Sequence, residues 1–145
     1  DPKARGIIFG LDLTHNRGDI FRAFLEGIAM GTAQVFETYE AIGQNPKKIM
    51  AVGGGTKNNI WMQATSDFSK IDQVVSEKST GASYGNAFLA ALAVGAVSQR
   101  DITRWNPPLS KIKTQHSTLH AQKNKLFRQL YESSKEIAHA VAEST

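Results

Sequence analysis

The sequence predicts an α/β domain in which a small sheet is covered by helices. Short apolar runs of strand-like composition alternate along the chain with helix-like periodic segments, the pattern of layered α/β domains. A glycine turn, residues 53–55, joins one predicted strand to the next helix. At 145 residues the chain has the length of one domain. A chain of this size buries about two-thirds of its extended surface.

The first predicted elements are a strand and a long helix. Residues 6–13 alternate imperfectly and are rich in branched and aromatic side chains. The helix is expected to begin near Asp19, whose carboxylate suits the helix dipole, and to end at Gly43. Gly27 and Gly31 predict a second backbone packed close to this helix. The apolar residues of the long helix recur along one face: Ile20, Phe24, Ile28, Val35, Tyr39 and Ile42.

The next elements flank the glycine turn. Residues 48–52 form an apolar run that predicts a buried strand. Thr56 or Asn58 is placed to cap a following helix over residues 59–68.

The rest of the chain predicts one more strand and two helices. Residues 73–76 indicate a strand at an edge of the sheet. A loop containing Ser79 opens a helix over residues 82–97, which is apolar nearly all round and is therefore expected to be buried. Residues 98–118 are expected to be irregular, and an amphipathic helix covers residues 120–142. Three strands are few for so many helices, which indicates that part of the domain is missing.

Composition excludes several classes of function. The net charge is +4, but the basic residues are dispersed and lack interleaved aromatic side chains, which argues against a nucleic-acid partner. No apolar run reaches 18 residues, so no membrane-spanning helix is expected. The absence of cysteine excludes disulfides and thiol nucleophiles, and it fits a cytoplasmic protein.

The glycine turn is the segment that points to a ligand. Glycines let a ligand approach the backbone, and the helix start that follows offers unpaired N–H groups to a phosphate. The segment is neither a Walker A loop nor a dinucleotide fingerprint. On this motif alone, a tight turn that binds nothing is the alternative.

Four segments, in order and in spacing, resemble the C-terminal part of the FGGY carbohydrate kinases. Xylulose kinases are the most similar members, and glycerol kinases are more distant. The segments are Asp1-Pro2-x-Ala4-Arg5-Gly6, Arg22-Ala23-x-Leu25-Glu26-Gly27-Ile28-Ala29, Gly53-Gly54-Gly55-Thr56-Lys57-Asn58-x-x-Trp61-x-Gln63-x-x-x-Asp67 and Gly85-x-Ala87-x-Leu89-Ala90-Ala91-x-Ala93-x-Gly95.

This resemblance implies the C-terminal portion of an actin-like, ribonuclease-H-like ATPase domain, with residues 1–145 forming a single partial domain without the sugar-binding domain. It implies ATP or ADP with Mg²⁺ as cofactor and a sugar or polyol as substrate. Gly53, Gly54 and Gly55 would lie against the nucleotide, and Asn58 would lie near the adenine. The family's catalytic Asp precedes the matched segments, so no catalytic residue and no metal ligand is assigned, and this chain alone is expected to be inactive.

Several alternatives stay open. Departures from the family at Ser66, Thr80 and Asn86 leave the sugar undecided. Asp12, at the end of a predicted strand, is a minor candidate for binding Mg²⁺. The chain could instead be a standalone nucleotide-binding regulatory module, or a structural domain with a vestigial site. Self-association into a homo-oligomer is plausible, because part of a domain exposes apolar surface.

Overall fold

The computed structural model describes residues 1–78 and 80–144, so Ser79 of the predicted loop lies outside the described residues. It is a mixed α/β structure with one three-stranded sheet, as the sequence predicts. The elements in chain order are α1 (Arg17–Ala41), β1 (Ile49–Ala51), the 3-10 helix η1 (Gly54–Lys57), α2 (Asn59–Ser69), β2 (Gln73–Ser76), α3 (Ala82–Ala93), the 3-10 helix η2 (Gln99–Asp101), α4 (Ile102–Trp105), β3 (Pro108–Ile112) and α5 (Thr118–Glu143).

The sheet has the order β1-β2-β3, with β1 parallel to β2 and β2 antiparallel to β3. The prediction that residues 73–76 form an edge strand is therefore wrong. It failed because residues 98–118 are not irregular throughout: they contain α4 and the strand β3, which pairs with the second side of β2. Pro108 is the first residue of β3, a position where a proline is tolerated in a strand.

Helix α1 has the predicted ends but a different buried face. Asn16 and Asp19 form a capping box at its start, and Gly43 follows its end with a φ of +80°. The residues predicted to line one apolar face, Phe24 and Ile28 among them, are about half exposed. The buried residues of α1 are instead Leu25, Ala29 and Ala33, and the two alanines pack against Ala64 and Phe68 of α2.

The glycines inside α1 do not mark a close backbone contact. A Cβ built on Gly27 or Gly31 meets nothing within 4 Å, so the prediction of a packed neighbour there is wrong for the described part of the chain.

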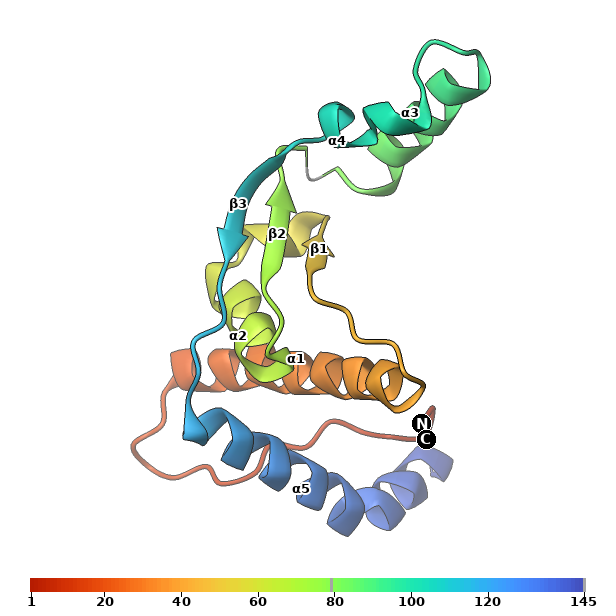
Figure 1. Cartoon of the computed structure of the whole chain (residues 1–145). Coiled ribbons are helices and arrows are strands. Elements are labelled where there is room, and N and C mark those ends of the chain that lie inside the picture. The colour runs from red at the N-terminus through yellow and green to blue at the C-terminus, as the bar shows by residue number, and fades with distance from the viewer. Residues whose placement is uncertain (79, 145) are drawn as a thin grey trace.

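Two further predictions are wrong. Residues 6–13 form an exposed segment that is neither helix nor strand. Helix α3 is not buried: Phe88 is its only buried residue, Leu89 is 60% exposed, and the helix lies at the far end of the molecule from α1 (Figure 1). Both segments are apolar in sequence, but no other part of the described structure packs over most of their apolar side chains.

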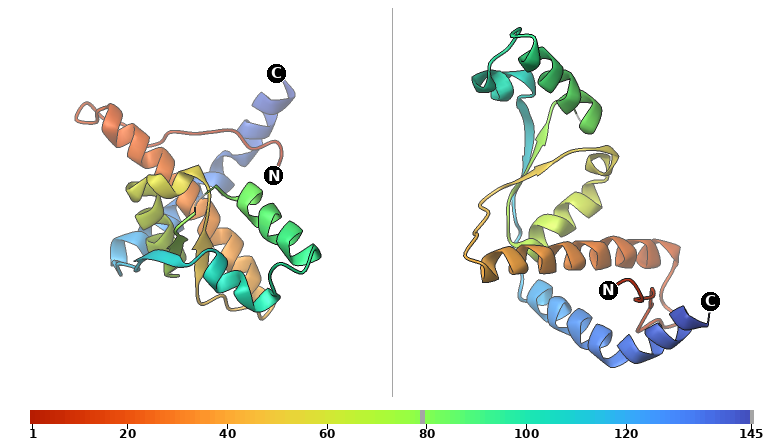
Figure 2. Two further views of the ribbon diagram at one scale, coloured as in Figure 1. Left: turned by 90° about the horizontal axis from the view of Figure 1, so that it is seen from above. Right: turned by 90° about the vertical axis from the view of Figure 1, so that its right-hand side faces the viewer.

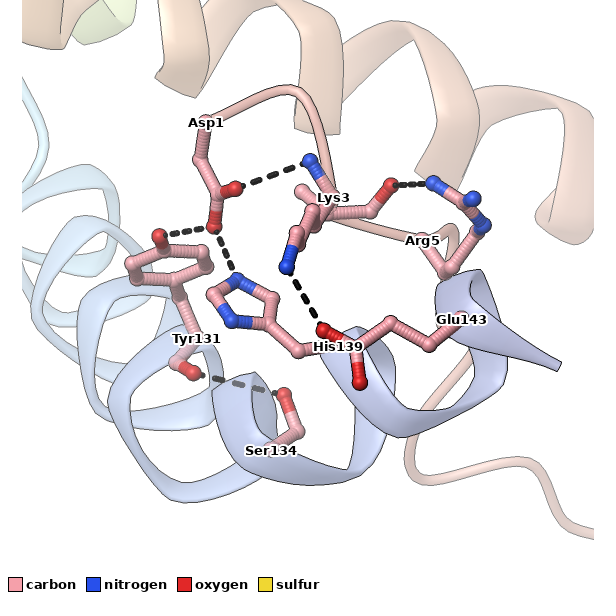
Figure 3. Close-up of polar contacts among 8 residues, drawn as sticks. Asp1, Lys3, Arg5, Tyr131, Ser134, His139 and Glu143 are labelled. Atoms are coloured by element: carbon pink, nitrogen blue, oxygen red, sulfur yellow. Dashed lines mark hydrogen bonds and ion pairs between the residues drawn. The ribbon is translucent and has the colours of Figure 1, made fainter.

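Helix α5 is held to the rest of the chain largely by polar contacts. Figures 1 and 2 show α1 lying between the sheet and α5, with the two chain ends close together. Lys123 Nζ lies 2.6 Å from Glu26 Oε2, and Arg128 pairs with Glu37. Figure 3 shows the other end of the helix, where three contacts fasten it to the N-terminal segment: Tyr131 Oη to Asp1 Oδ2 at 2.6 Å, His139 Nε2 to Asp1 Oδ2 at 2.8 Å and Lys3 Nζ to Glu143 Oε1 at 2.6 Å.

Candidate functional site

The predicted strand, glycine turn and helix are all present, but the strand is not buried as predicted: Met50 is 48% exposed. Strand β1 ends at Ala51, and the chain turns through Gly53 into η1 and then into α2. This arrangement places the turn at the carboxyl end of a strand that pairs in parallel with its neighbour, which is where open α/β sheets bind ligands.

The three glycines of the turn differ in conformation and surroundings. Gly53 has a φ of +94°, a conformation that L side chains rarely adopt. Gly54 is exposed, and a Cβ there meets nothing within 4 Å. A Cβ on Gly55 would lie 2.8 Å from Cζ3 of Trp61, so Gly55 makes room for the indole ring. Gly53 and Gly54 both have open space where a Cβ would lie, and Gly54 is the more exposed of the two.

The 3-10 helix η1, which precedes α2, has the polar groups expected of an anion site. The first amides of a helix have no acceptor within it, and no acceptor is recorded among the described residues for the amides of Gly54 and Gly55. Lys57 is exposed beside them. These groups give the turn a positive electrostatic character that suits a phosphate.

Asn58 caps α2. Its Oδ1 accepts a hydrogen bond from Trp61 N at 3.1 Å, and its carbonyl accepts one from Met62 N at 3.0 Å. The cap explains why an asparagine suits this position without any ligand. The cap uses the side-chain oxygen, and the described residues record no partner for Nδ2.

Gln63 and Asp67 have structural roles. Gln63 Nε2 donates to Asp67 Oδ1 at 2.8 Å and to the carbonyl of Lys113 at 2.9 Å. Asp67 Oδ1 also accepts from Gln115 N at 2.7 Å. The pair ties α2 to the chain that follows β3, which stabilises the helix whose start forms the turn.

The buried polar contact between Gln73 and Ser66 was not predicted from the sequence. Gln73 of β2 is 2% exposed, and its Nε2 donates to Ser66 Oγ at 2.9 Å and to the carbonyl of Met62. Ser66, one of the departures from the family pattern, is fully buried. The hydroxyl therefore has a local partner, which joins α2 to the central strand. The signal in the sequence was a polar residue, Gln73, directly before the two valines of the strand.

Asp12 is not at a strand end, so the reason for considering it as a Mg²⁺ ligand is removed. It lies in an exposed loop, where its Oδ1 accepts hydrogen bonds from Thr14 Oγ1 at 2.6 Å and Thr14 N at 2.8 Å. These bonds and the nearby His15 hold the pKa of the Asp12 carboxyl below its ordinary value. Within residues 1–78 and 80–144 no group of three metal-ligating side chains is found.

Comparison with known sequences identifies relatives. Residues 1–94 match the FGGY family of carbohydrate kinases, C-terminal domain. Xylulose kinase of Bacillus subtilis is 33% identical over 95 residues, which are 66% of this chain and 19% of that protein. Glycerol kinase of Pasteurella multocida is 41% identical over 98 residues, again 66% and 19%. The chain thus spans about a fifth of the length of these relatives.

Comparison with solved structures also identifies xylulose and glycerol kinases. Xylulose kinase from Rhodospirillum rubrum superimposes with a TM-score of 0.83 at 27% identity, over 96% of this chain and 29% of that chain. Glycerol kinase of Plasmodium falciparum, solved with ADP, gives 0.71 at 26% identity, over 93% and 27%. These neighbours have the actin-like ATPase fold that the resemblance implies. No helix in the described ranges is long and apolar enough to cross a membrane. The chain belongs to the FGGY family of carbohydrate kinases, and its first 94 residues match the C-terminal domain of that family.

Proposed function

We propose that this chain forms one wall of the nucleotide site of an ATP-dependent sugar or polyol kinase of the xylulose kinase type. The whole protein would transfer the γ-phosphoryl group of ATP to a sugar hydroxyl in the cytoplasm. The observation that carries the proposal is the open backbone at Gly54, between the end of β1 and the capped start of α2. The relatives support the proposal, because they are named xylulose kinase and glycerol kinase.

The residues of the turn fit a nucleotide. Gly54 lets a phosphate or ribose contact the main chain, and the free amides of Gly54 and Gly55 are donors for a phosphate oxygen. Lys57 adds a positive charge nearby. Asn58 Nδ2 is left as a donor for the base, because Oδ1 is committed to the helix cap.

The chain's contribution to catalysis is positional. Phosphoryl transfer depends on aligning the nucleotide with the acceptor and on stabilising the charge of the transferring group. Mg²⁺, bound with ATP, would neutralise part of that charge. The glycine turn would hold the nucleotide in place, whereas the base that removes the sugar proton, and the sugar site, are expected outside residues 1–145. We propose that these residues are one partial domain, which does not phosphorylate a sugar alone.

Calorimetric titration with ADP and Mg²⁺ tests the nucleotide site. We expect the chain to bind ADP, and Gly54→Val to abolish binding because its side chain fills the ligand's approach. Gly6→Val is the matched control, since Gly6 also has open space around its Cβ. It belongs to the N-terminal segment, which lies on the other side of α1 from the turn (Figure 1). Urea unfolding should show both variants folded.

The outcomes separate the competing functions. Equal ADP binding by Gly54→Val and by the parent sequence contradicts a site at this turn. No binding by this chain, together with no effect of Gly54→Val in the full-length kinase, would indicate a vestigial turn. Binding by a chain that proves to be the whole gene product would favour a standalone regulatory module.

A further inference from the structure

Trp61 contacts the glycine turn with its main chain and with its side chain. Its amide donates a hydrogen bond to Asn58 Oδ1 at 3.1 Å, the bond that caps α2. Its ring carbons Cζ3, Cε3 and Cη2 lie 2.8, 3.3 and 3.5 Å from the place where a Cβ on Gly55 would lie. The indole is partly buried. The proposed function gives Trp61 no role, although the residue belongs to the motif segment that contains the turn.

The indole ring and the open backbone lie on different sides of η1. Gly54 and Gly55 are neighbours in this 3-10 helix, which has about three residues per turn, so the directions of their Cβ positions differ by about 120°. The direction from Gly54 leads into open space, whereas the direction from Gly55 leads to the indole. A ligand that approaches Gly54 therefore meets the main chain first. Trp61 acts on such a ligand through the position of the turn.

The hydrogen bonds recorded for the turn set its shape. The Gly53 carbonyl accepts from Thr56 N at 3.2 Å and from Thr56 Oγ1 at 2.8 Å, and the Gly55 carbonyl accepts from Asn58 N at 3.0 Å. All of these bonds join residues of the turn to one another or to the cap residue. The contact between the indole and Gly55 is of a different kind, because it sets how closely the turn lies against the side of α2.

We infer that Trp61 is a positioning residue of the nucleotide site, whose ring fixes the place at which the turn presents its backbone to ADP. The amides of Gly54 and Gly55 are the donors proposed for a phosphate oxygen, and such bonds keep good geometry only over about 2.7–3.2 Å. A methyl group on Gly55 would force the ring and the turn apart by several tenths of an ångström. A displacement of that size is comparable with the whole useful range of the hydrogen bond.

Calorimetric titration with ADP and Mg²⁺ tests the inference on four proteins: the parent sequence, Gly55→Ala, Trp61→Leu and the double variant. We expect Gly55→Ala to weaken ADP binding at least about tenfold, because small misplacements of binding groups are costly. In the Trp61→Leu background the same substitution should change the affinity less than about twofold, since the methyl group then has room. Trp61→Leu alone should weaken binding about three- to tenfold through loss of the support.

Phe68→Leu is the matched control. Phe68 lies near the other end of α2 and is 3% exposed, so its replacement also removes a ring from the helix and lowers stability. It should leave the affinity for ADP unchanged, because Phe68 belongs to the core cluster with Ala29, Ala33 and Ala64. Urea unfolding verifies that each variant is folded under the titration conditions. If Trp61→Leu does not fold, Trp61→Phe, whose ring is smaller, takes its place.

Amide hydrogen exchange without ADP reads the position of the turn directly. Thr56 N and Asn58 N donate the two backbone bonds of the turn. We expect their exchange, relative to that of Val74 in β2, to become at least about fivefold faster in Trp61→Leu and to stay unchanged in Phe68→Leu. This measurement needs no ligand, so it distinguishes a failure of the inference from a failure of the proposed function, on which only the identity of the ligand rests.

Three results would overturn the inference. The first is an affinity of Gly55→Ala for ADP equal to that of the parent sequence, which is what a purely structural contact predicts. The second is an equal weakening by Gly55→Ala in both backgrounds, which would show that the indole is not the group displaced. The third is unchanged exchange at Thr56 and Asn58 in Trp61→Leu. If the parent sequence does not bind ADP, the proposed nucleotide site fails in this chain, and the exchange measurement alone decides whether Trp61 positions the turn.

Discussion

The indole ring of Trp61 lies against the backbone of Gly55, so close that a Cβ on Gly55 would be 2.8 Å from Cζ3. Real Cβ atoms do not approach a ring carbon so closely, and the ring is held in place by the helix that Asn58 caps. The turn and the first turn of α2 therefore form one unit. A change on either side is expected to displace the open backbone of Gly54.

We predict that Gly55→Ala lowers the free energy of unfolding by about 1–3 kcal/mol, because the added methyl group overpacks the contact with Trp61. In a Trp61→Leu background the same substitution should have a much smaller effect. Urea unfolding of the four proteins gives the coupling energy. Gly54→Ala is the control, since its Cβ enters open space. An equal loss of unfolding free energy in both backgrounds would show that the indole ring is not the reason why position 55 is a glycine.

Asn58 allows capping to be separated from nucleotide contact. Asn58→Ala should lower the free energy of unfolding by about 1 kcal/mol through loss of the cap. Asn58→Asp keeps an oxygen for Trp61 N but removes the Nδ2 donor, so it should preserve stability and weaken ADP binding by about 1–3 kcal/mol. Denaturant unfolding and calorimetry measure the two effects. Unchanged ADP affinity in Asn58→Asp would leave Asn58 with the capping role alone.

The parts of this structure that the sequence predicted are those encoded locally. Gly43 ends α1 because a glycine tolerates positive φ there, and residues 53–58 turn and cap through contacts within a few positions. The strand–turn–helix of the candidate site is of this kind. The ion pair between Arg22 and Glu26 is equally local, because the two residues are four apart on α1, and Arg22 Nε lies 2.9 Å from Glu26 Oε1.

The errors concern contacts between distant segments. Strand β3 pairs with β2 across more than thirty residues of sequence, and its own composition carries no clear strand pattern. The buried row on α1 consists mainly of alanines, whose small side chains give a weaker periodic signal than Phe24 or Val35. Residues 6–13 and α3 show the reverse case: their apolar pattern predicts burial, and the surface that would cover them is not among the described residues.

We predict that Ser66→Ala lowers the free energy of unfolding by about 0.5–1.5 kcal/mol, because it removes an acceptor of Gln73 Nε2 inside the core. The loss is modest because Nε2 keeps its bond to the carbonyl of Met62. Ser66→Val should have a larger effect, since the fully buried site has no room for a second methyl group. Ser83→Ala, on the exposed surface of α3, is the control in urea unfolding. A Ser66→Val variant as stable as the parent sequence would contradict the claim that the site has no room for a larger side chain.

Glu26 provides a prediction about pH. Its side chain is 12% exposed and contacts Lys123 and Arg22. Burial alone raises the pKa of the carboxyl, but the hydrogen bonds from Lys123 and Arg22 outweigh burial, so the pKa in the folded chain lies below the ordinary value of 4.5. A carboxyl of lowered pKa stabilises the fold above its unfolded pKa, and this contribution is lost as the pH falls through the folded pKa.

We therefore expect Glu26→Gln to lower the free energy of unfolding at pH 7 by about 1–2 kcal/mol, and the difference from the parent sequence to shrink as the pH falls below 4.5. Urea unfolding at pH 7 and at acid pH measures both effects. Glu136→Gln removes an exposed carboxylate on α5 for which the described residues record no ion pair, so it should leave stability nearly unchanged at both pH values. A difference for Glu26→Gln that is constant with pH would show that the ionised carboxylate does not hold α5 to α1, because the lost contact would then be independent of its charge.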